Sequence, residues 1–191
     1  MSYSRLFAIY GLPTSPSPVF PSPSRLFESA FIGVYPWLLP SYNWPMNWQK
    51  NIITGAEQIR ELLSTTTTIA VLGIKTEAQA NQPAFYVPRY LESAGFQIIP
   101  VPVYYPQVTY ILGQQVYRKL IEIPVEVDVV NVFRRSQDVP AHLDDILAKK
   151  PKAVWLQSGI RDDSVAETLA KADIKVVQDR CLMVDHRNLG R

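Results

Sequence analysis

The stretch that decides the fold is residues 68–95, TIAVLGIKTEAQANQPAFYVPRYLESAG. An apolar run stops at Gly73, a polar turn follows, and apolar residues then recur at helical spacing from Val87 to Gly95, which has the position of a helix C-cap. The stretch therefore predicts a strand, a glycine turn and a helix. In a parallel sheet this unit brings free backbone N–H groups and the positive end of a helix dipole to the strand's carboxyl end. We expect that turn to hold the pyrophosphate of a nucleotide cofactor.

Strand-like and helix-like segments alternate in the rest of the chain. We expect four more strands, over residues 96–103, 127–133, 153–156 and 175–177. We expect six helices. The first follows a Thr54 cap with Glu57 as its capping-box partner, and the fourth, over 139–150, follows an Asp138 cap. Of the others, one begins at about Val87, and the rest lie near residues 116–121, over 163–172 and at 181–189. This order predicts a doubly wound α/β domain: a mainly parallel five-stranded sheet with helices on both faces. Its ligand site is expected at the carboxyl edge of the sheet.

Composition excludes several classes of protein. The net charge of +2 is too small for a nucleic-acid-binding protein, and no run of about 18 apolar residues predicts a transmembrane helix. Cys181 is the one cysteine in the sequence, which rules out an internal disulfide and is typical of a reducing compartment. We therefore expect a cytoplasmic protein that contacts neither nucleic acid nor membrane.

The composition changes near residue 50. Half of the 16 prolines and three of the four tryptophans lie before residue 51. Dense proline disfavours helices and central strands, so residues 1–50 are expected to be a poorly ordered extension of a domain spanning 51–191. Two interpretations stay open: Met46 is the natural start, or residues 1–45 are a targeting segment that directs the protein to an organelle.

The turn residues disfavour the two commonest nucleotides. Gly73 is followed by Ile74, Lys75 and Thr76, so the later glycines of a dinucleotide fingerprint are missing. No carboxylate follows the second strand, where NAD would need one for its ribose, and no Walker loop is present. An NAD(P)-binding enzyme or redox sensor remains the alternative.

Three segments resemble the CoA-binding domain family. They are VNVFRR at 130–135, AVWLQSGI at 153–160 and KVVQDRC at 175–181. The resemblance covers residues 52–189 and implies a single Rossmann-type domain, similar to the CoA-binding domain of the succinyl-CoA synthetase α subunit. It implies CoA or an acyl-CoA as the cofactor. The implied contacts are Gly73, Ile74 and Lys75 at the first turn, Val101 and Pro102 after the second strand, Phe133, Arg134 and Pro140 in the third loop, and Gln157 and Gly159 in the fourth.

The chain departs from the family pattern around these positions. Members often carry Asn-Pro after the second strand, where this chain has Val101-Pro102 followed by Val103-Tyr104-Tyr105-Pro106. Pro88 lies where the first helix should continue, so we expect that helix to begin near Val87 with Pro88 in its first turn.

No set of residues at catalytic or metal-ligand spacing is found, and we expect a non-catalytic carrier, sensor or regulatory module. Cys181 is interpreted either as an inert packing residue or as a redox or acyl-accepting group near the thiol end of bound CoA. A third hypothesis is a protein-interaction module with a vestigial pocket. A protein partner or a homo-oligomer is compatible with all three hypotheses.

Overall fold

The predicted strand, turn and helix are present, and the strand lies next to the edge strand of the sheet. The computed structural model describes residues 47–189. Strand β2 (Thr68–Leu72) is buried along its whole length, and helix α2 (Pro83–Ser93) follows it after a short 3-10 turn, η2 (Glu77–Gln79). The predictions for residues 1–46 lie outside the described residues, whereas residues 48–50, also assigned to the extension, belong to a 3-10 turn.

The sheet has six parallel strands rather than the five predicted. Its order is β1 (Ile52–Ile53), β8 (Lys175–Val177), β7 (Ala153–Leu156), β6 (Val129–Val132), β2 and β3 (Gln97–Val101). The doubly wound α/β prediction is confirmed and the count of five is wrong. The additional strand, β1, is two residues long and pairs with β8, so it is too short to show a periodicity. A 3-10 turn, η1 (Trp48–Asn51), precedes it, and the Asn51 side chain donates to the Ala170 carbonyl at 2.9 Å.

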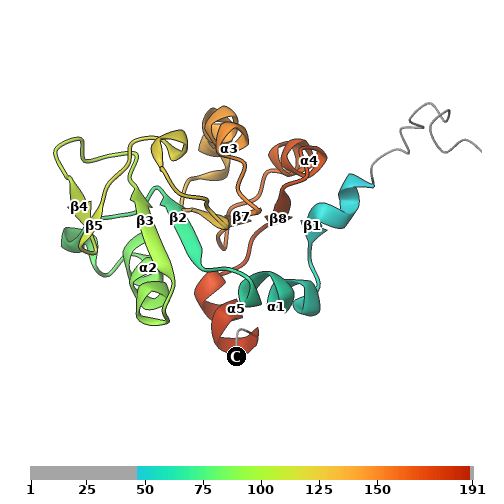
Figure 1. Cartoon of the computed structure of the whole chain (residues 1–191), viewed down its shortest axis with the longest axis horizontal. Helices are drawn as coiled ribbons and strands as arrows, with labels where there is room; N and C mark the ends of the chain where they lie inside the picture. Colours follow the sequence, from blue (N-terminus) through green and yellow to red (C-terminus); the bar gives the residue numbers. More distant parts are fainter. Residues whose placement is uncertain (1–46, 190–191) are drawn as a thin grey trace, which may run out of the picture. The chain divides into compact units, whose positions relative to one another are not determined.

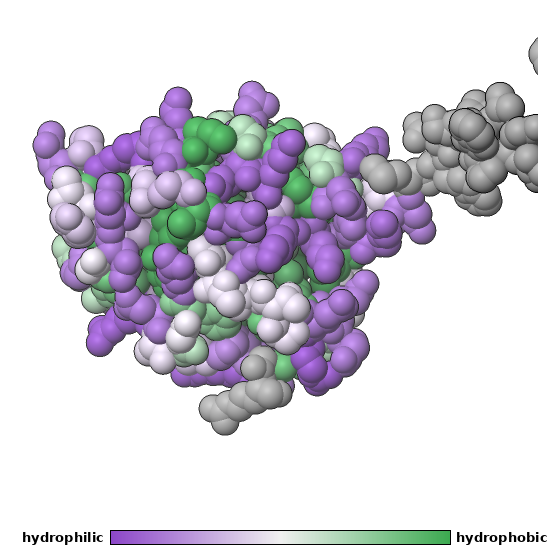
Figure 2. Space-filling model, viewed as in Figure 1, coloured by the Kyte–Doolittle hydropathy of each residue, from purple (hydrophilic) through white to green (hydrophobic). Residues whose placement is uncertain are grey.

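Helices cover both faces of the sheet (Figure 1). Helices α1 (Ala56–Ser64), α2 and α5 (Leu182–Leu189) lie on one face, and α3 (Leu143–Lys149) and α4 (Asp163–Lys171) lie on the other. Side chains alternate accordingly: Ile69 and Val71 pack toward the first group, and Ala70 and Leu72 toward the second. Hydrophilic side chains dominate the surface seen in Figure 2, with smaller separate apolar patches between them. Within residues 47–189 no helix is long and apolar enough to cross a membrane.

Two helix starts differ from the predictions. The N-cap of α1 is Gly55, whose N–H donates to the Gln58 side chain at 3.3 Å, so the predicted Thr54 cap is wrong by one residue. Helix α2 begins at Pro83 and contains Pro88 in its interior, so the expected start near Val87 is also wrong. Pro83 suits the first helical position because its missing N–H would have no partner there.

The segments after β3 are less helical than predicted. Strands β4 (Tyr110–Ile111) and β5 (Gln114–Gln115) form a hairpin, and the helix expected near residues 116–121 is only a 3-10 turn, η3 (Leu120–Glu122). The helix expected over 139–150 is divided into a 3-10 turn, η4 (Ser136–His142), and α3. Asp138 lies inside η4 rather than capping a helix, because Arg134 and Arg135 both bind its carboxylate.

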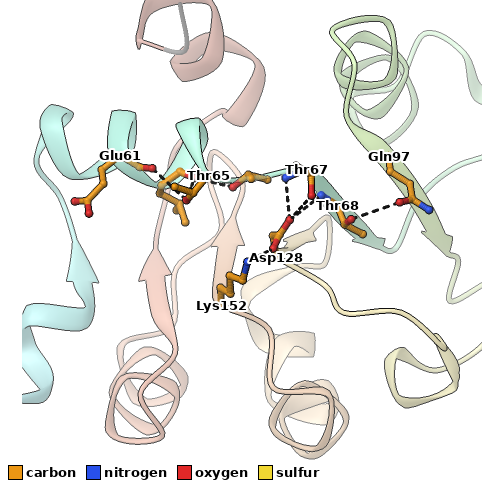
Figure 3. A network of polar contacts seen from close by, with 9 residues as sticks. Glu61, Thr65, Thr67, Thr68, Gln97, Asp128 and Lys152 are labelled. Atoms are coloured by element: carbon orange, nitrogen blue, oxygen red, sulfur yellow. Dashed lines mark hydrogen bonds and ion pairs between the residues drawn. The ribbon is translucent and has the colours of Figure 1, made fainter.

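A buried carboxylate joins three strands at the amino edge of the sheet (Figure 3). Asp128 accepts hydrogen bonds from the Thr67 N–H (2.8 Å), the Thr67 hydroxyl (2.9 Å) and the Thr68 N–H (2.9 Å), and pairs with Lys152 at 2.6 Å. Burial alone would raise the pKa of Asp128, but the hydrogen bonds from Lys152, Thr67 and Thr68 outweigh it and hold that pKa below its ordinary value. This network fixes the edge opposite to the expected ligand site.

Candidate functional site

A cavity of about 600 Å³ opens at the carboxyl edge of the sheet, and we call it the main cavity. Its walls come from the loops after β2, β6 and β7, the first turn of α2, and the segment before α5. The lining residues are Lys75, Gln82, Pro83, Ala84, Tyr86, Val87, Phe133, Arg134, Arg135, Gln157, Ser158, Gly159, Ile160 and Cys181. The volume is within the range of about 300–1,000 Å³ that is usual for small-molecule sites.

The lining of the main cavity is cationic. It contains Lys75, Arg134 and Arg135 and no carboxylate. Arg134 is the most enclosed of the three, with 12% of its side chain exposed, and it pairs with Asp138 at 3.3 Å. Its Nε is buried and has no hydrogen-bond partner in the described part of the chain. A buried guanidinium N–H is costly to leave unpaired, so the hydrogen bonding of Arg134 is incomplete.

Backbone amides of the first turn contribute less than the sequence suggested. The Gly73 N–H donates to the Val101 carbonyl at 2.8 Å, and the Lys75 N–H donates to the Ala84 carbonyl at 3.1 Å. Ala84 lies four residues before Pro88, which has no N–H, so its carbonyl lacks the usual helical donor and accepts from the turn instead. These two amides are therefore used inside the protein, and the expectation that they are free for phosphate is wrong.

Gly73 is needed for a close approach between neighbouring loops. It has a φ of +89°, and a Cβ added to it would lie 2.7 Å from the Phe133 carbonyl oxygen. The glycine therefore lets the loop after β2 pack directly against the loop after β6, which carries Phe133 and Arg134 into the main cavity.

The start of α2 supplies the electropositive end of a helix. Phe85 and Tyr86 donate their N–H groups to the Gln82 carbonyl at 2.9 and 3.0 Å. Ala84, at the second helical position, has no intrahelical acceptor for its N–H, and it lines the main cavity beside Gln82. The helix dipole thus adds to the positive potential of Lys75 and Arg134.

Two tyrosines lie against the cations at the rim. The Lys75 ammonium donates to the Tyr105 hydroxyl at 3.2 Å and lies 5.2 Å from the centre of the Tyr104 ring. The Arg134 guanidinium lies 5.3 Å from the same ring. Tyr104 is 52% exposed, and the hydrogen bond and charge of Arg134 lower the pKa of its phenol.

An amide pair lies beneath the opening. Gln157 donates from Nε2 to Oδ1 of Asn131 at 2.8 Å, and both residues are buried. Nδ2 of Asn131 has no partner within the described residues. The Gly159 N–H donates to the Asp179 carboxylate at 2.6 Å, so this predicted contact is also paired inside the protein. Asn131 was not predicted as part of the site, although an amide inside the apolar strand VVNV is the signal that could have found it.

The structure gathers five of the ten predicted contacts, Lys75, Phe133, Arg134, Gln157 and Gly159, in the main cavity. The other five lie elsewhere. Ile74 and Val101 are each 1% exposed and belong to the core. Gly73 is buried against the Phe133 backbone, and Pro140 is exposed on η4. Pro102 lines a separate hollow of about 230 Å³, the side cavity, together with Leu72, Val103, Tyr104, Pro106, Arg118, His142 and Asp145. Burial and the charge of Arg134 lower the pKa of His142 there.

Residues from α2 are the main omission of the sequence-based site. Gln82, Pro83, Ala84, Tyr86 and Val87 line the main cavity because α2 begins four residues earlier than expected. Within residues 47–189 no group of three or more His, Cys, Asp or Glu side chains could hold a metal ion.

Comparison with known proteins gives the family. Residues 67–187 match the CoA binding domain. The chain belongs to the CoA-binding domain family. The protein YneT of Bacillus subtilis, described as uncharacterized, is 30% identical over 129 residues, which are 68% of this chain and 92% of YneT.

Two solved structures show the same architecture. The Thermus thermophilus protein described as cell-free ID.343 is 39% identical, with a TM-score of 0.65 over 71% of this chain and 99% of that one. A hypothetical protein from Pyrococcus horikoshii OT3 is 26% identical, with a TM-score of 0.64 over 71% of this chain and 92% of its own. Both structures align over nearly their whole length with about 71% of this chain.

Proposed function

We propose that this protein binds CoA or an acyl-CoA in the main cavity, as a carrier, sensor or regulatory module without chemistry of its own. The observation that carries the proposal is the cationic lining, in which Lys75, Arg134 and Arg135 face an opening that contains no carboxylate. CoA carries a pyrophosphate and a 3′-phosphate, and the family supports a CoA-related ligand.

The lining divides by chemistry in a way that suits such a ligand. Lys75, Arg134 and the start of α2 would hold phosphate oxygens by charge-assisted hydrogen bonds. Val87, Phe133 and Ile160 provide apolar surface for the pantetheine arm. Arg134 binds Asp138 through Nη2, so its other terminal nitrogen can pair with phosphate while that ion pair is kept.

A binding role is supported by the composition of the lining. The lining contains no His, Asp or Glu, and of its remaining titratable groups, Lys75, Tyr86 and Cys181, the proposal assigns Lys75 to phosphate. A cytoplasmic location is part of the proposal and is based on the single cysteine in the sequence.

Calorimetric titration of the full chain tests the proposal. We expect CoA to bind more tightly than dephospho-CoA, because its 3′-phosphate contacts the cationic lining. We expect it also to bind more tightly than NADPH, which carries as many phosphates but lacks the pantetheine arm for the apolar lining. Absence of heat with CoA at millimolar concentration would overturn CoA binding. Tighter binding of NADPH would favour the NAD(P) alternative, and binding of no nucleotide would favour an interaction module.

The Lys75→Gln variant should bind CoA roughly 10- to 100-fold more weakly, since one charged hydrogen bond to phosphate is worth about 1.5–3 kcal/mol. Arg60→Gln is the matched control because Arg60 is an exposed cation on α1 whose one ion pair within residues 47–189 is with Glu57 on its own helix. Its affinity for CoA should equal that of the wild type. Equal affinities of all three proteins would show that Lys75 does not contact the ligand.

A further inference from the structure

We propose that Tyr104 and Tyr105 are positioning residues, which hold Lys75 and Arg134 in place for a polyanionic ligand through their rings and the Tyr105 hydroxyl. This inference rests on the proposed function and adds the residues that organise its anion site. Both tyrosines lie in the segment where the sequence departs from the family pattern.

The contacts converge from three loops. Lys75 follows β2, Arg134 follows β6, and the tyrosines follow β3. The Lys75 ammonium is 5.2 Å from the Tyr104 ring centre and 5.5 Å from that of Tyr105, and the Arg134 guanidinium is 5.3 Å from that of Tyr104. Each distance is within the roughly 6 Å over which a cation is attracted to the negative face of an aromatic ring. One ring, Tyr104, therefore serves both cations.

This arrangement reduces the repulsion between Lys75 and Arg134. Two cations on adjacent loops repel each other, and Asp138 offsets the charge of Arg134 alone. The π face of Tyr104 attracts both cations without carrying a net charge. Lys75 has no carboxylate partner within residues 47–189, so its charge stays available to an incoming anion.

The tyrosine segment is itself held in place. The Arg118 guanidinium donates to the carbonyls of Tyr105 at 3.2 Å and Pro106 at 3.0 Å, and also to that of Val108. Tyr105 has a φ of +65°, an unfavourable conformation for a residue with a side chain. Such a conformation persists only where its surroundings determine it, and here the Arg118 contacts do so. The segment that carries the two tyrosines thus has a defined conformation.

The test replaces Tyr104 in the full chain by phenylalanine and by di- and trifluorinated phenylalanines. Fluorination preserves the shape of the ring and removes the negative potential of its face, so it separates cation attraction from packing. Tyr104→Phe is the reference for the series, and we expect it to bind CoA slightly more weakly than the wild type, because it loses the hydroxyl that is hydrogen-bonded to Arg134. Affinity should then fall in steps with each fluorine, to a total loss of roughly 3- to 10-fold for the contacts with two cations. Tyr105→Phe, which removes the hydroxyl bound to Lys75, should weaken binding by a smaller factor.

Inorganic pyrophosphate is the second probe and separates this inference from the proposed function. A graded loss with CoA supports both. Unchanged CoA affinity across the fluorinated series overturns the role of Tyr104 and leaves CoA binding intact. If CoA does not bind but pyrophosphate binds with the graded dependence, the anion site stands and the proposed ligand is wrong. If neither binds to the wild type, both proposals are overturned.

Discussion

Replacement of Asp128 by alanine is expected to lower the free energy of unfolding by about 3 kcal/mol, since hydrogen bonds to a charged group contribute about 1.5–3 kcal/mol each and some are replaced by water. The carboxylate accepts from two backbone N–H groups and one hydroxyl, and it also pairs with Lys152. Without it, the Thr67 and Thr68 amides at the start of β2 lose their acceptor. In thermal unfolding the loss should lower the Tm by roughly 10 °C.

The effect of Asp128 should depend on pH in a defined direction. Its folded-state pKa lies below the ordinary value, so its stabilisation is present above the unfolded pKa of about 4 and is lost as the pH falls through the folded value. The unfolding free energies of wild type and Asp128→Ala should therefore differ most at neutral pH and converge below about pH 4.

Asp144→Asn is the control for Asp128. Asp144 is an exposed carboxylate in the first turn of α3, and its replacement should change stability by less than about 0.5 kcal/mol. Chemical denaturation of the three proteins at several pH values measures both effects. If Asp128→Ala were as stable as the control at pH 7, the network of Figure 3 would have no energetic role.

Replacement of Gly73 by alanine is expected to cost about 2–4 kcal/mol of stability and to weaken CoA binding. The positive φ of +89° is strained for any residue with a Cβ, and the new methyl group would lie 2.7 Å from the Phe133 carbonyl oxygen. Because this neighbour is backbone, the loop after β6 has to move. Arg134 moves with that loop, so the loss extends to the proposed anion site.

Gly113→Ala is the control that measures the cost of the positive φ alone, without a steric clash. Gly113 also has a positive φ, +67°, but an added Cβ meets nothing within 4 Å. It should therefore lose only the conformational part, about 1 kcal/mol. Denaturation curves and CoA titrations of both variants measure the difference. An equal loss in the two variants, with unchanged CoA affinity in Gly73→Ala, would show that the close approach of the two loops has no consequence.

The parts of the fold that were predicted are those with strong local signals. Strands β2, β6 and β7 are buried on both faces, so they appear as continuous apolar runs, and Gly73 marks the end of the first. Strand β1 was missed because two residues carry no periodicity. The interior position of Pro88 was missed because an isolated helix disfavours it, whereas here the turn at Lys75 uses the freed Ala84 carbonyl.

The site was predicted in outline only. Residues that end strands, such as Arg134 and Gln157, reach the main cavity because parallel strands end at one edge. The direction of each side chain depends on contacts that are distant in sequence, and this is why Ile74 and Val101 belong to the core instead. The role of Tyr104 could not be predicted, since it depends on loops after three different strands lying together.

Mapping of amide chemical shifts during a CoA titration tests the central claim most directly, because a second cationic hollow exists. Lys149, Lys150 and Lys152 line a cavity of about 420 Å³ at the amino edge of the sheet. The account predicts that shift changes are concentrated on amides of the main cavity, above all Ala84 and Arg134, and that those near Lys150 do not move. Changes concentrated around Lys150, with the main cavity unaffected, would contradict it.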